Sequence, residues 1–566
     1  MWILGISKSH NGAVALVNNG KVVCAIQAER ISRIKRQAIN LTNDKSLVSK
    51  CVKYCLNYAG IKYSDLQSIA ICTPWDVNRL KDKDLFNNIG GNPQNYKGTY
   101  YVPHHYAHAE YILHYSNLSK GIVLVIDGSG SKENDRNNFN IKENIDKKYI
   151  SHTHTTGKET ISAYWFDGKQ LVLIYRFSQS SDKNHKCNKN SNGFLQSIGH
   201  YWRWASNYCC GSHSEAGKVM GIAAFGNPNI YKNLNILSID EKGFIKLNYE
   251  KLNNKFNSPN IFGKDLTGNS HYSDIAAMVQ KDTENAIFSI LKILKKRYPT
   301  DTLYYAGGVA LNMVVNEKII RSHLFDNVIL NGSAEDNGTA IGAALATSNF
   351  LNSERKGEAL TDYYGKKYSS EEILVAIKKF PFRYEIIKES EKYKKIAKLI
   401  FDNNAVGWFQ DRSEFGPRAL GNRSILANPS NPSMKNILDL NIKQRDRYRP
   451  YAPVVLEEHA KKYFDIDGIS PVMMSGGKVL SKDFPAITHI DGSARVQTLS
   501  KKDNLTFYKM IQSFQNLSGY PIILNTSFNL PGEPIVESPT DALNSFQNGS
   551  LQYLCLGNYL VSRITR

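Results

Sequence analysis

The sequence predicts an α/β protein whose N-terminal part is a duplicated, sheet-centred unit and whose C-terminal part is a second α/β domain. Three observations support this prediction. The chain has 566 residues, enough for at least two domains that each bury a core. A strand–turn–strand–hairpin pattern occurs twice in the first part. Near residue 350 the chain becomes polar and linker-like, so we expect domains at residues 1–350 and 351–566.

The first copy of the repeated pattern is WILGISKSHNGAVALVNNGKVVCAIQAER, in which a polar turn and an NNG hairpin separate three apolar runs. The second copy comprises GIVLVIDGSG and ISAYWFDGKQLVLIYRF. Residues 131–158 between its two parts are polar, which indicates an inserted loop with His152 and His154 exposed to solvent. Two sheet-centred lobes with a cleft between them are typical of actin-like (ASKHA) nucleotide-binding proteins.

A candidate metal site is distributed over three separate motifs of the N-terminal part. His104 and His108 in HHYAHAE are four residues apart, a spacing that places both imidazoles on one face of a helix. Asp127 follows the apolar run VLVI, and Asp336 lies between the apolar run VIL and the helix-like TAIGAALA. Two imidazoles with two carboxylates suit iron, manganese or zinc better than calcium or magnesium.

Glycine-rich turns in the same part of the chain indicate where a nucleotide can approach the backbone. DGSG is a tight turn that admits a ligand, and YYAGGVALN is predicted to be a strand, a turn and a helix start whose amides can face a phosphate or ribose. SEAGKVMG adds a lysine among closely spaced glycines, although packing is an alternative role for any one glycine. These motifs supply the candidate cofactor-binding residues Gly128, Lys218, Gly307, Gly308 and Asn312.

The C-terminal part carries basic residues on loops rather than on amphipathic helix faces. They lie beside glycines, prolines and small polar residues in GPRALGNRS, KQRDRYRPYAP and DGSARVQ. Guanidinium groups on such loops suit multiply charged phosphoryl groups, with surface salt bridges as the alternative. The set comprises Arg418, Arg423, Lys443, Arg447, Arg449 and Arg495. After the strand-like run PIIL, Asn525, Thr526 and Ser527 offer neutral hydrogen-bond partners to a small polar substrate.

Composition and charge restrict the partners. The net charge of +20 permits an acidic partner such as a nucleotide, a phosphate or nucleic acid, but a general abundance of lysine and asparagine in the organism's proteins explains it equally well. Because no apolar run reaches membrane-spanning length and no secretory signal is recognisable, we expect a cytoplasmic protein without a membrane partner. The scattered cysteines predict reduced, mostly buried thiols.

Taken together, the ordered motifs resemble those of the ATP-dependent O-carbamoyltransferases related to the nodulation-factor, cephamycin and aminoglycoside carbamoylation enzymes. The resemblance extends from SHNGAVALVNNGKVV to SPTDAL, almost the whole chain. The motifs that carry it are HHYAHAE, DGSG, EAGKVMG, GGVALN, EDNGTAIGAA, EFGPRALGNRS, YRPYAP, DGSARVQ and LNTSFN. The resemblance implies an actin-like N-terminal domain and a C-terminal domain similar to the carbamoyl-adenylate-forming domain of transfer-RNA threonylcarbamoylation.

A reaction at two sites is the functional implication of this resemblance. The C-terminal domain converts carbamoyl phosphate and ATP to carbamoyl adenylate, and the N-terminal domain transfers the carbamoyl group to a hydroxyl. Carried over by motif, the residues that bind carbamoyl phosphate and ATP are Arg418, Arg449, Arg495, Asn525 and Lys443, with Arg447 and Ser527 as further candidates and Lys443 and Arg495 as catalytic ones. A divalent metal, expected to be Fe(II), is held against the adenylate phosphate by His104, His108, Asp127 and Asp336.

His10, in the first hairpin turn, is the candidate base for the acceptor hydroxyl. It occupies the position where the family places a histidine, and such a base accelerates attack by a hydroxyl about 10²–10⁴-fold. Family members commonly have aspartate next, whereas this chain has Asn11, so His10 lacks that neighbouring negative charge. Closure of the turn is the alternative role of His10.

The sequence leaves the acceptor and the oligomeric state open. One acceptor hypothesis is a small hydroxylated natural product, and a second is a hydroxymethylated base in DNA or a nucleotide. HYWRWAS offers Tyr201, Trp202, Arg203 and Trp204 as a stacking platform for bases, with core positions or a small-substrate wall as the alternative. A transfer-RNA threonylcarbamoylation enzyme is disfavoured by the domain order, and a non-catalytic actin-like module by the second set of arginines. A homodimer is one alternative for the assembly.

Overall fold

The computed structural model describes residues 1–41, 45–74, 82–91, 94–132, 139, 141–145, 157–179, 195–256, 270–352 and 355–563, so His152 and His154 lie outside the described residues. The chain divides into two compact units. Unit 1 comprises Met1–Val23, Ala38–Val52 and Gly60–Ala359, and unit 2 comprises Cys24–Gln37, Lys53–Ala59 and Leu360–Arg566. No pattern in the sequence indicates that two N-terminal segments belong to unit 2. The assignment of separate roles to residues 1–350 and 351–566 stays a prediction.

The first sheet has the strand order β3-β2-β1-β4-β5. Its strands are β1 (Trp2–Ser7), β2 (Ala13–Asn18), β3 (Lys21–Gln27), β4 (Leu66–Cys72) and β5 (Gly98–Val102). β1 pairs antiparallel with β2 and parallel with β4, and β4 pairs parallel with β5. The central strands are apolar on both faces and buried along nearly their whole length, as expected for strands covered on both sides.

The second sheet of unit 1 repeats this arrangement, with the order β13-β12-β6-β8-β9-β7. Its strands are β6 (Gly121–Ile126), β7 (Lys142–Glu143), β8 (Lys158–Phe166), β9 (Leu171–Gln179), β12 (Thr302–Ala306) and β13 (Asn327–Leu330). β6 pairs antiparallel with β8 and parallel with β12, as β1 does with β2 and β4. The predicted duplication is therefore confirmed, and the fold of unit 1 is of the actin-like type.

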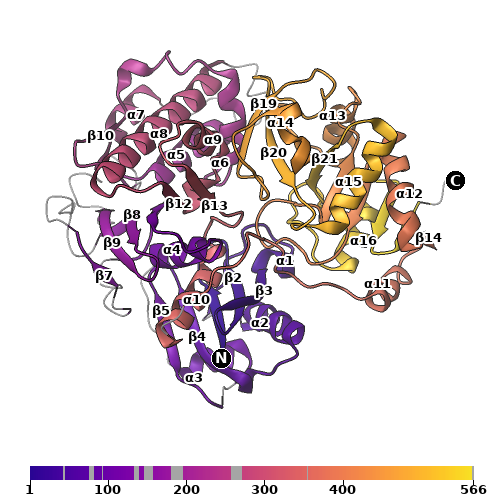
Figure 1. The fold of residues 1–566 in the computed structure, drawn as a ribbon, viewed down its shortest axis with the longest axis horizontal. Coiled ribbons are helices and arrows are strands. Elements are labelled where there is room, and N and C mark those ends of the chain that lie inside the picture. The colour runs from indigo at the N-terminus through magenta and orange to yellow at the C-terminus, as the bar shows by residue number, and fades with distance from the viewer. Residues whose placement is uncertain are drawn as a thin grey trace. The chain divides into compact units, whose positions relative to one another are not determined.

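Two helices, one from each repeat, pack against each other inside unit 1 (Figure 1). α4 (His104–His114) follows β5 and contacts β6 and β12, whereas α10 (Gly338–Asn352) follows β13 and contacts β1, β2 and β4. The other helices of this part of the chain are α1 (Ala28–Ser32), α2 (Lys45–Ala59), α3 (Asp82–Ile89), α5 (Ile198–Cys210), α6 (Ala216–Ile222), α7 (Tyr249–Lys255), α8 (Ser270–Arg297) and α9 (Met313–Arg321), and β10 (Leu237–Ile239) and β11 (Ile245–Leu247) form a small ribbon. α1 and the second half of α2 belong to unit 2.

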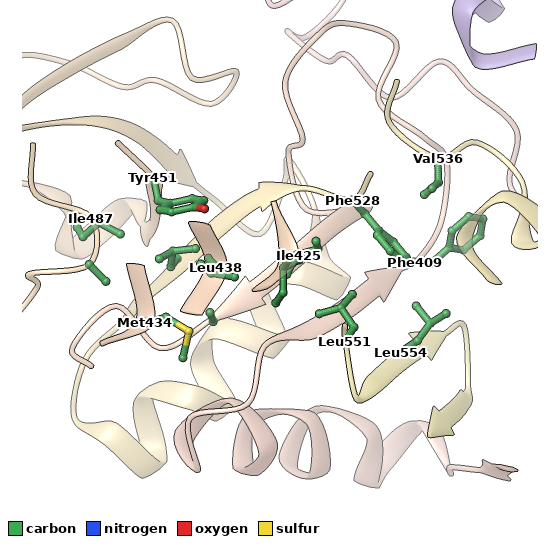
Figure 2. Packing of buried hydrophobic residues seen from close by; sticks show 14 of the residues in the cluster. Phe409, Ile425, Met434, Leu438, Tyr451, Ile487, Phe528, Val536, Leu551 and Leu554 are labelled. Carbon is green, nitrogen blue, oxygen red and sulfur yellow. The ribbon is translucent and has the colours of Figure 1, made fainter. Parts of the chain in front are cut away.

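Unit 2 is built on one ten-stranded sheet with the order β14-β23-β22-β15-β16-β21-β17-β20-β19-β18. These strands are β14 (Arg383–Ile386), β15 (Val406–Phe409), β16 (Arg423–Ala427), β17 (Ala452–Leu456), β18 (Phe464–Asp465), β19 (Ser475–Val479), β20 (Ser493–Leu499), β21 (Ile522–Ser527), β22 (Tyr553–Leu556) and β23 (Tyr559–Ser562). The helices are α11 (Ser370–Ile377), α12 (Glu389–Phe401), α13 (Met434–Ile437), α14 (Ala460–Tyr463), α15 (Leu505–Ser518) and α16 (Pro539–Asn548). In the core cluster of this unit, Phe409, Ile425 and Phe528 lie with Met434 of α13 (Figure 2), and α11 and α16 contribute further buried side chains to the same cluster.

Two further findings concern the whole of the described chain. Among the described residues, no helix combines the length and the apolar character that crossing a bilayer requires. Six of the seven described cysteines are buried, and all seven are free thiols, as the sequence predicts.

The contact between α4 and α10 leaves no room for a side chain at Gly342. A Cβ atom there would lie 1.8 Å from the carbonyl oxygen of Ala107, which is on the turn of α4 between His104 and His108. We therefore expect Gly342→Ala to destabilise unit 1 by about 1–3 kcal/mol, measured as a lowered thermal unfolding midpoint. Gly217→Ala is the matched control, because a Cβ on this glycine of α6 meets no atom within 4 Å. Equal midpoints for the two variants would contradict the close packing.

Candidate metal centre and anion site

Three elements of unit 1 bring four metal-ligating side chains together. His104 and His108 lie on the first turns of α4, Asp127 directly follows β6, and Asp336 precedes α10 by two residues. One ligand atom from each residue lies within 4.8 Å of all the others, and the four side chains are buried. The four residues that the sequence singles out are thus close together in the folded chain, and their binding of a metal stays a prediction.

The distances within this cluster fit a metal ion. Nε2 of His104 lies 3.0 Å from Oδ2 of Asp127, 3.3 Å from Oδ1 of Asp336 and 3.3 Å from Nε2 of His108. Nε2 of His108 lies 3.9 Å and 4.0 Å from the same two carboxylate oxygens. Ligands that bind one ion at about 2.1 Å lie about 3–4 Å apart, so the cluster has the dimensions of a coordination shell.

The electrostatics of the cluster also favour a cation. Burial opposes ionisation of Asp336, but His104 and His10 hold the pKa of its carboxyl well below the usual value. Burial and then the neighbouring His104 lower the pKa of His108 to about 4, so this imidazole is neutral at pH 7 and offers a lone pair. Although burial favours neutral His104, Asp336, Cys72 and Asp127 raise its pKa above the usual value. Two ionised carboxylates beside neutral His108, and beside His104 once a metal displaces its proton, form a set of donors that suits a divalent transition metal.

Further contacts orient the four side chains. Nδ1 of His104 lies 3.4 Å from Sγ of the buried Cys72 at the end of β4, and the His104 amide donates to Oγ of Ser131 at 2.8 Å. The amide of Gly308 donates to Oδ1 of Asp127 at 3.3 Å. The hydroxyl of Ser7 donates to the Asp336 carbonyl at 2.7 Å. Such outer contacts fix imidazole tautomers and carboxylate directions around a metal.

His10 stands beside the cluster in the turn between β1 and β2. Its Nδ1 lies 3.2 Å from Oδ2 of Asp336, and its side chain is 57% exposed, unlike the buried ligands. The Asp336 carboxylate, opposed by burial, raises the pKa of His10 to about 9. Asn11 donates from Nδ2 to Oε2 of Glu335 at 2.6 Å, a contact that an aspartate at this position would replace with repulsion between two carboxylates. The asparagine therefore has a specific partner in this chain.

The candidate nucleotide-binding residues of unit 1 have different surroundings. Gly307 has φ of +92° and abuts the backbone of Ile126, and its neighbour Gly308 contacts Asp127. Asn312 caps α9 by accepting from the Val315 amide and donates to Gln280, so its side chain is occupied within the protein. The remaining two candidates lie elsewhere: Lys218 is 3.7 Å from Glu215, and Gly128 lies beside the His200 ring. Their contact with a nucleotide stays a prediction.

Sequence reasoning missed two asparagines near Asp336. Asn331 follows β13 and Asn337 follows Asp336, and both side chains are buried. Neither amide has a hydrogen-bond partner among the described residues. A buried amide left without a partner costs about 1–3 kcal/mol, so these groups suit a polar ligand or ordered water. Asparagine is common in this chain, which is why composition gave no signal.

A second candidate site lies in unit 2, where several arginines converge. Burial lowers the pKa of Arg495 well below its usual value, and the positive charges of Arg418, Arg449 and Arg445 lower it further. Nε of Arg495, on β20, is buried and has no hydrogen-bond partner within the described chain. Like charges gathered in this way are stabilised by a multiply charged anion. Arg445 is a member of this group that the sequence did not single out.

Lys443, Asn525 and Ser527 surround the same region. Nζ of the buried Lys443 donates to the carbonyl of Ser527 at 2.7 Å and to Oδ1 and the carbonyl of Asn529 at 2.8 and 3.1 Å. Burial and then Arg445 lower the pKa of Lys443 well below its usual value. Asn525 donates to the Ala419 carbonyl at 2.9 Å, while its buried Oδ1 has no partner among the described residues. Lys443 thus orders the loop after β21, and the Asn525 oxygen is left for a ligand.

Two basic residues from the same motifs have other surroundings. Arg423 is fully buried and donates to backbone carbonyls, including those of Gln410 at 2.5 Å and Asn422 at 3.0 Å, so the expectation that it binds phosphate is wrong. Its guanidinium also stacks on Phe409, 3.6 Å from the ring centre. Arg447 is exposed. The charges that lower the pKa of Arg495 include Arg445 but not Arg447. The role of Arg447 in binding stays a prediction.

The aromatic residues of HYWRWAS belong to the core of unit 1. Tyr201, Trp202 and Trp204 on α5 are no more than 7% exposed, whereas Arg203 is exposed. Tyr201 donates to Asp282 at 3.0 Å, and the Trp202 indole donates to Thr283 at 2.9 Å. The stacking-platform alternative is therefore wrong, because these rings have no free face for a base.

Comparison with known proteins agrees with the motifs. The family model "Carbamoyltransferase N-terminus" matches residues 2–345, and "Carbamoyltransferase C-terminus" matches residues 397–563. The chain is 29% identical to Nodulation protein NolNO of Sinorhizobium fredii (98% of this chain, 79% of the relative) and 31% identical to Nodulation protein NolO of Bradyrhizobium diazoefficiens (81% and 78%). It is 28% identical to 3'-hydroxymethylcephem-O-carbamoyltransferase of Streptomyces clavuligerus (62% and 65%). Full-length HypF in its phosphate- and nucleotide-bound form gives a TM-score of 0.39 at 13% identity (64% and 56%).

We expect His108→Ala to reduce metal binding at least about tenfold, because it removes one of four ligands. Metal content after loading with Fe(II) or Co(II) and desalting is the measurement. His114→Gln is the matched control, since His114 lies on the same helix but contacts Lys356 and Glu358 instead of the cluster. Undiminished metal content in His108→Ala would rule out the proposed ligand set.

Proposed function

The chain belongs to the carbamoyltransferase family, and we propose that it is an ATP-dependent O-carbamoyltransferase acting on a hydroxyl of a small natural product. The observation that carries the proposal is the presence of two charged clusters of opposite character in one chain. Unit 1 gathers two carboxylates and two imidazoles, and unit 2 gathers at least four basic side chains. The first suits a metal that binds a phosphate, and the second suits phosphoryl substrates directly.

The proposed activation consumes carbamoyl phosphate and ATP. Water cleaves carbamoyl phosphate to carbamate and inorganic phosphate. A carbamate oxygen then attacks the α-phosphorus of ATP, the bond to the β-phosphate oxygen breaks, and pyrophosphate leaves, so carbamoyl adenylate is formed. In the transfer step the acceptor oxygen attacks the carbamoyl carbon, its proton passes to a base, and AMP leaves. Each carbamate ester therefore costs one ATP and releases phosphate, pyrophosphate and AMP.

Activation is assigned to unit 2. Bringing carbamoyl phosphate and ATP together requires fixed cations to offset their mutual repulsion, and Arg418, Arg445, Arg449 and Arg495 supply them. Asn525 offers its unpartnered oxygen to the carbamoyl NH₂ group, and Lys443 holds the Ser527–Asn529 backbone in place. Because the donors are fixed before the substrates arrive, little reorganisation is needed during the reaction.

Transfer is assigned to unit 1. His104, His108, Asp127 and Asp336 would hold the divalent metal, for which Fe(II) is proposed, and the metal would supply Lewis-acid stabilisation to the adenylate phosphate. His10 lies at the rim of this cluster with an exposed ring, where an acceptor hydroxyl can reach it. We assign His10 the role of the base that accepts the hydroxyl proton, with Asp336 orienting its ring through Nδ1. A divalent metal held by Asp336 would offset the carboxylate charge that raises the pKa of His10, and so would favour the neutral imidazole that this role requires.

The proposed acceptor is a small hydroxylated molecule. Two relatives, from Streptomyces clavuligerus and Amycolatopsis lactamdurans, are named 3'-hydroxymethylcephem-O-carbamoyltransferase. The alternative acceptor in DNA loses the stacking platform, since the aromatic side chains of α5 are buried, and rests on the net charge of +20 alone. A cytoplasmic location belongs to the same proposal because the reaction draws on the ATP pool.

The first test is release of pyrophosphate from ATP by the iron-loaded protein, with and without carbamoyl phosphate. We expect release to require carbamoyl phosphate, and we expect Arg495→Ala to reduce it at least about 100-fold, because a half-buried cation assigned to the phosphoryl groups is lost. Metal content should be unchanged in that variant. Arg383→Ala, which removes an exposed arginine of β14 from the same sheet, is the matched control. Release that is independent of carbamoyl phosphate would refute the proposed activation.

His10→Ala separates the two half-reactions. We expect carbamoyl-phosphate-dependent pyrophosphate formation in a single turnover to remain, while carbamate ester formation on a panel of hydroxymethyl cephems and sugars falls by about 10²–10⁴-fold. Mass spectrometry of the panel and quenched pyrophosphate assays measure the two quantities. His323→Ala is a control, as His323 follows α9 outside the cluster. An equal loss of both half-reactions would show that His10 does not act in transfer alone.

A further inference from the structure

We propose that α1 and its flanking residues Gln27 and Arg33 position two loops at the anion site of unit 2, one that carries Arg418 and one that Lys443 contacts. This inference rests on the proposed function for its kinetic readout. α1 occurs early in the chain, within the stretch matched by the N-terminal family model, yet it belongs to the same compact unit as residues 360–566. The arginines and lysine of the activation site would then depend on a segment more than 300 residues away in sequence.

The first loop held by this segment precedes Arg418. The Gln27 side-chain amide donates to the Phe415 carbonyl, and Nη2 of the buried Arg30 donates to the Gly416 carbonyl at 2.7 Å. These two carbonyls belong to the EFGPRALGN motif, two and three residues before Arg418. Since the motif lies outside regular strands and helices, side-chain donors of this kind determine its path.

The second loop lies after β21 and is held by Arg33. Nη1 of Arg33 donates to the Ile535 carbonyl and Nη2 to the Pro534 carbonyl, both at 2.8 Å. The same guanidinium lies 3.8 Å from carboxylate oxygens of Glu533 and Asp541. One fork therefore bridges consecutive carbonyls and faces two acids, a geometry that a planar guanidinium satisfies and an ammonium does not.

Hydrogen bonds connect the Arg33 contact to Lys443. Nδ2 of Asn529 donates to the Glu533 carbonyl at 2.7 Å, and Oδ1 of Asn529 accepts from Nζ of Lys443 at 2.8 Å. Nζ also donates to the Ser527 carbonyl. A displacement of residues 533–535 would thus move Asn529 and the ammonium that it helps to hold. Arg33 acts through these groups and is a positioning residue, without contact with a substrate.

Local structure presents Arg33 to this loop. It is the C-cap of α1, with φ of +62° and its amide donating to the Glu29 carbonyl at 2.9 Å. The left-handed conformation ends the helix after five residues and turns the chain. Arg36 shares the left-handed conformation, with φ of +55°, but is exposed. Arg33 and Arg36 therefore form a matched pair for comparison. They share the left-handed backbone conformation and differ in their contact with residues 533–535.

The test compares Arg33→Ala, Arg33→Lys and Arg36→Ala in the full-length, metal-loaded protein. We expect Arg33→Ala to raise the KM for carbamoyl phosphate in pyrophosphate release at least about tenfold, with a smaller effect on kcat, because the site is displaced rather than removed. Arg33→Lys should fall between Arg33→Ala and the wild type, and Arg36→Ala should match the wild type. A wild-type KM in both Arg33 variants would overturn the inference.

Hydrogen–deuterium exchange provides a readout that does not depend on turnover. We expect faster exchange in residues 527–536 of Arg33→Ala than in the wild type. We also expect that protecting residues 414–423 and 527–536 of this variant requires a carbamoyl phosphate concentration at least about tenfold higher than in the wild type. If the wild-type protein released no pyrophosphate, the proposed function would fail while this exchange comparison still decided the inference. If Arg33→Ala exchanged rapidly throughout unit 2, Arg33→Lys would decide instead: unaltered protection would overturn the inference, and weakened protection confined to the two loops would support it.

Discussion

The packing of α4 against α10 is the contact on which the candidate metal centre depends. Gly342 lets the two helices approach so closely that a Cβ atom at this position would clash with the Ala107 carbonyl. Ala107 lies between His104 and His108 in the sequence of α4. The approach places the start of α4 beside Asp336, which precedes α10. Because both helices also pack on a sheet, shifting either one would disturb strand contacts as well. Close packing therefore fixes the distances between ligands that are far apart in sequence.

The duplication of unit 1 explains why these ligands meet. α4 follows β5 and α10 follows β13, and these two strands occupy equivalent places in the two sheets. Asp127 lies between β6 and β8, the position that His10 takes between β1 and β2. The first repeat thus contributes the histidines, and the second contributes the aspartates. The equivalent turns carry His10 and Asp127, and the equivalent helix starts carry His104 and Asp336, so the two repeats supply different kinds of side chain to one site.

The parts of this arrangement that follow short-range rules could be predicted from the sequence. The spacing of His104 and His108 required only helix periodicity, and Asp127 was placed by the apolar run before it. Arg423 could not be distinguished from its neighbours, because its burial against Phe409 and the Gln410 carbonyl depends on pairing between β15 and β16. The contribution of α1 to unit 2 could not be predicted from the sequence either, because a side chain that donates to a backbone carbonyl does not require a particular residue type at that carbonyl.

Opposite charge requirements give a physical reason for two separate sites. The cluster of unit 1 contains two ionised carboxylates, which attract a cation and repel free carbamoyl phosphate or ATP. The arginines of unit 2 have the reverse preference, because an anion relieves their mutual repulsion, which adds to the effect of burial in lowering the pKa of Arg495. A single pocket holding both sets would pair its own carboxylates with its own guanidiniums and lose its affinity for phosphoryl groups. Separation keeps each set available, and in the proposed reaction the activated carbamoyl group would then have to pass from one site to the other.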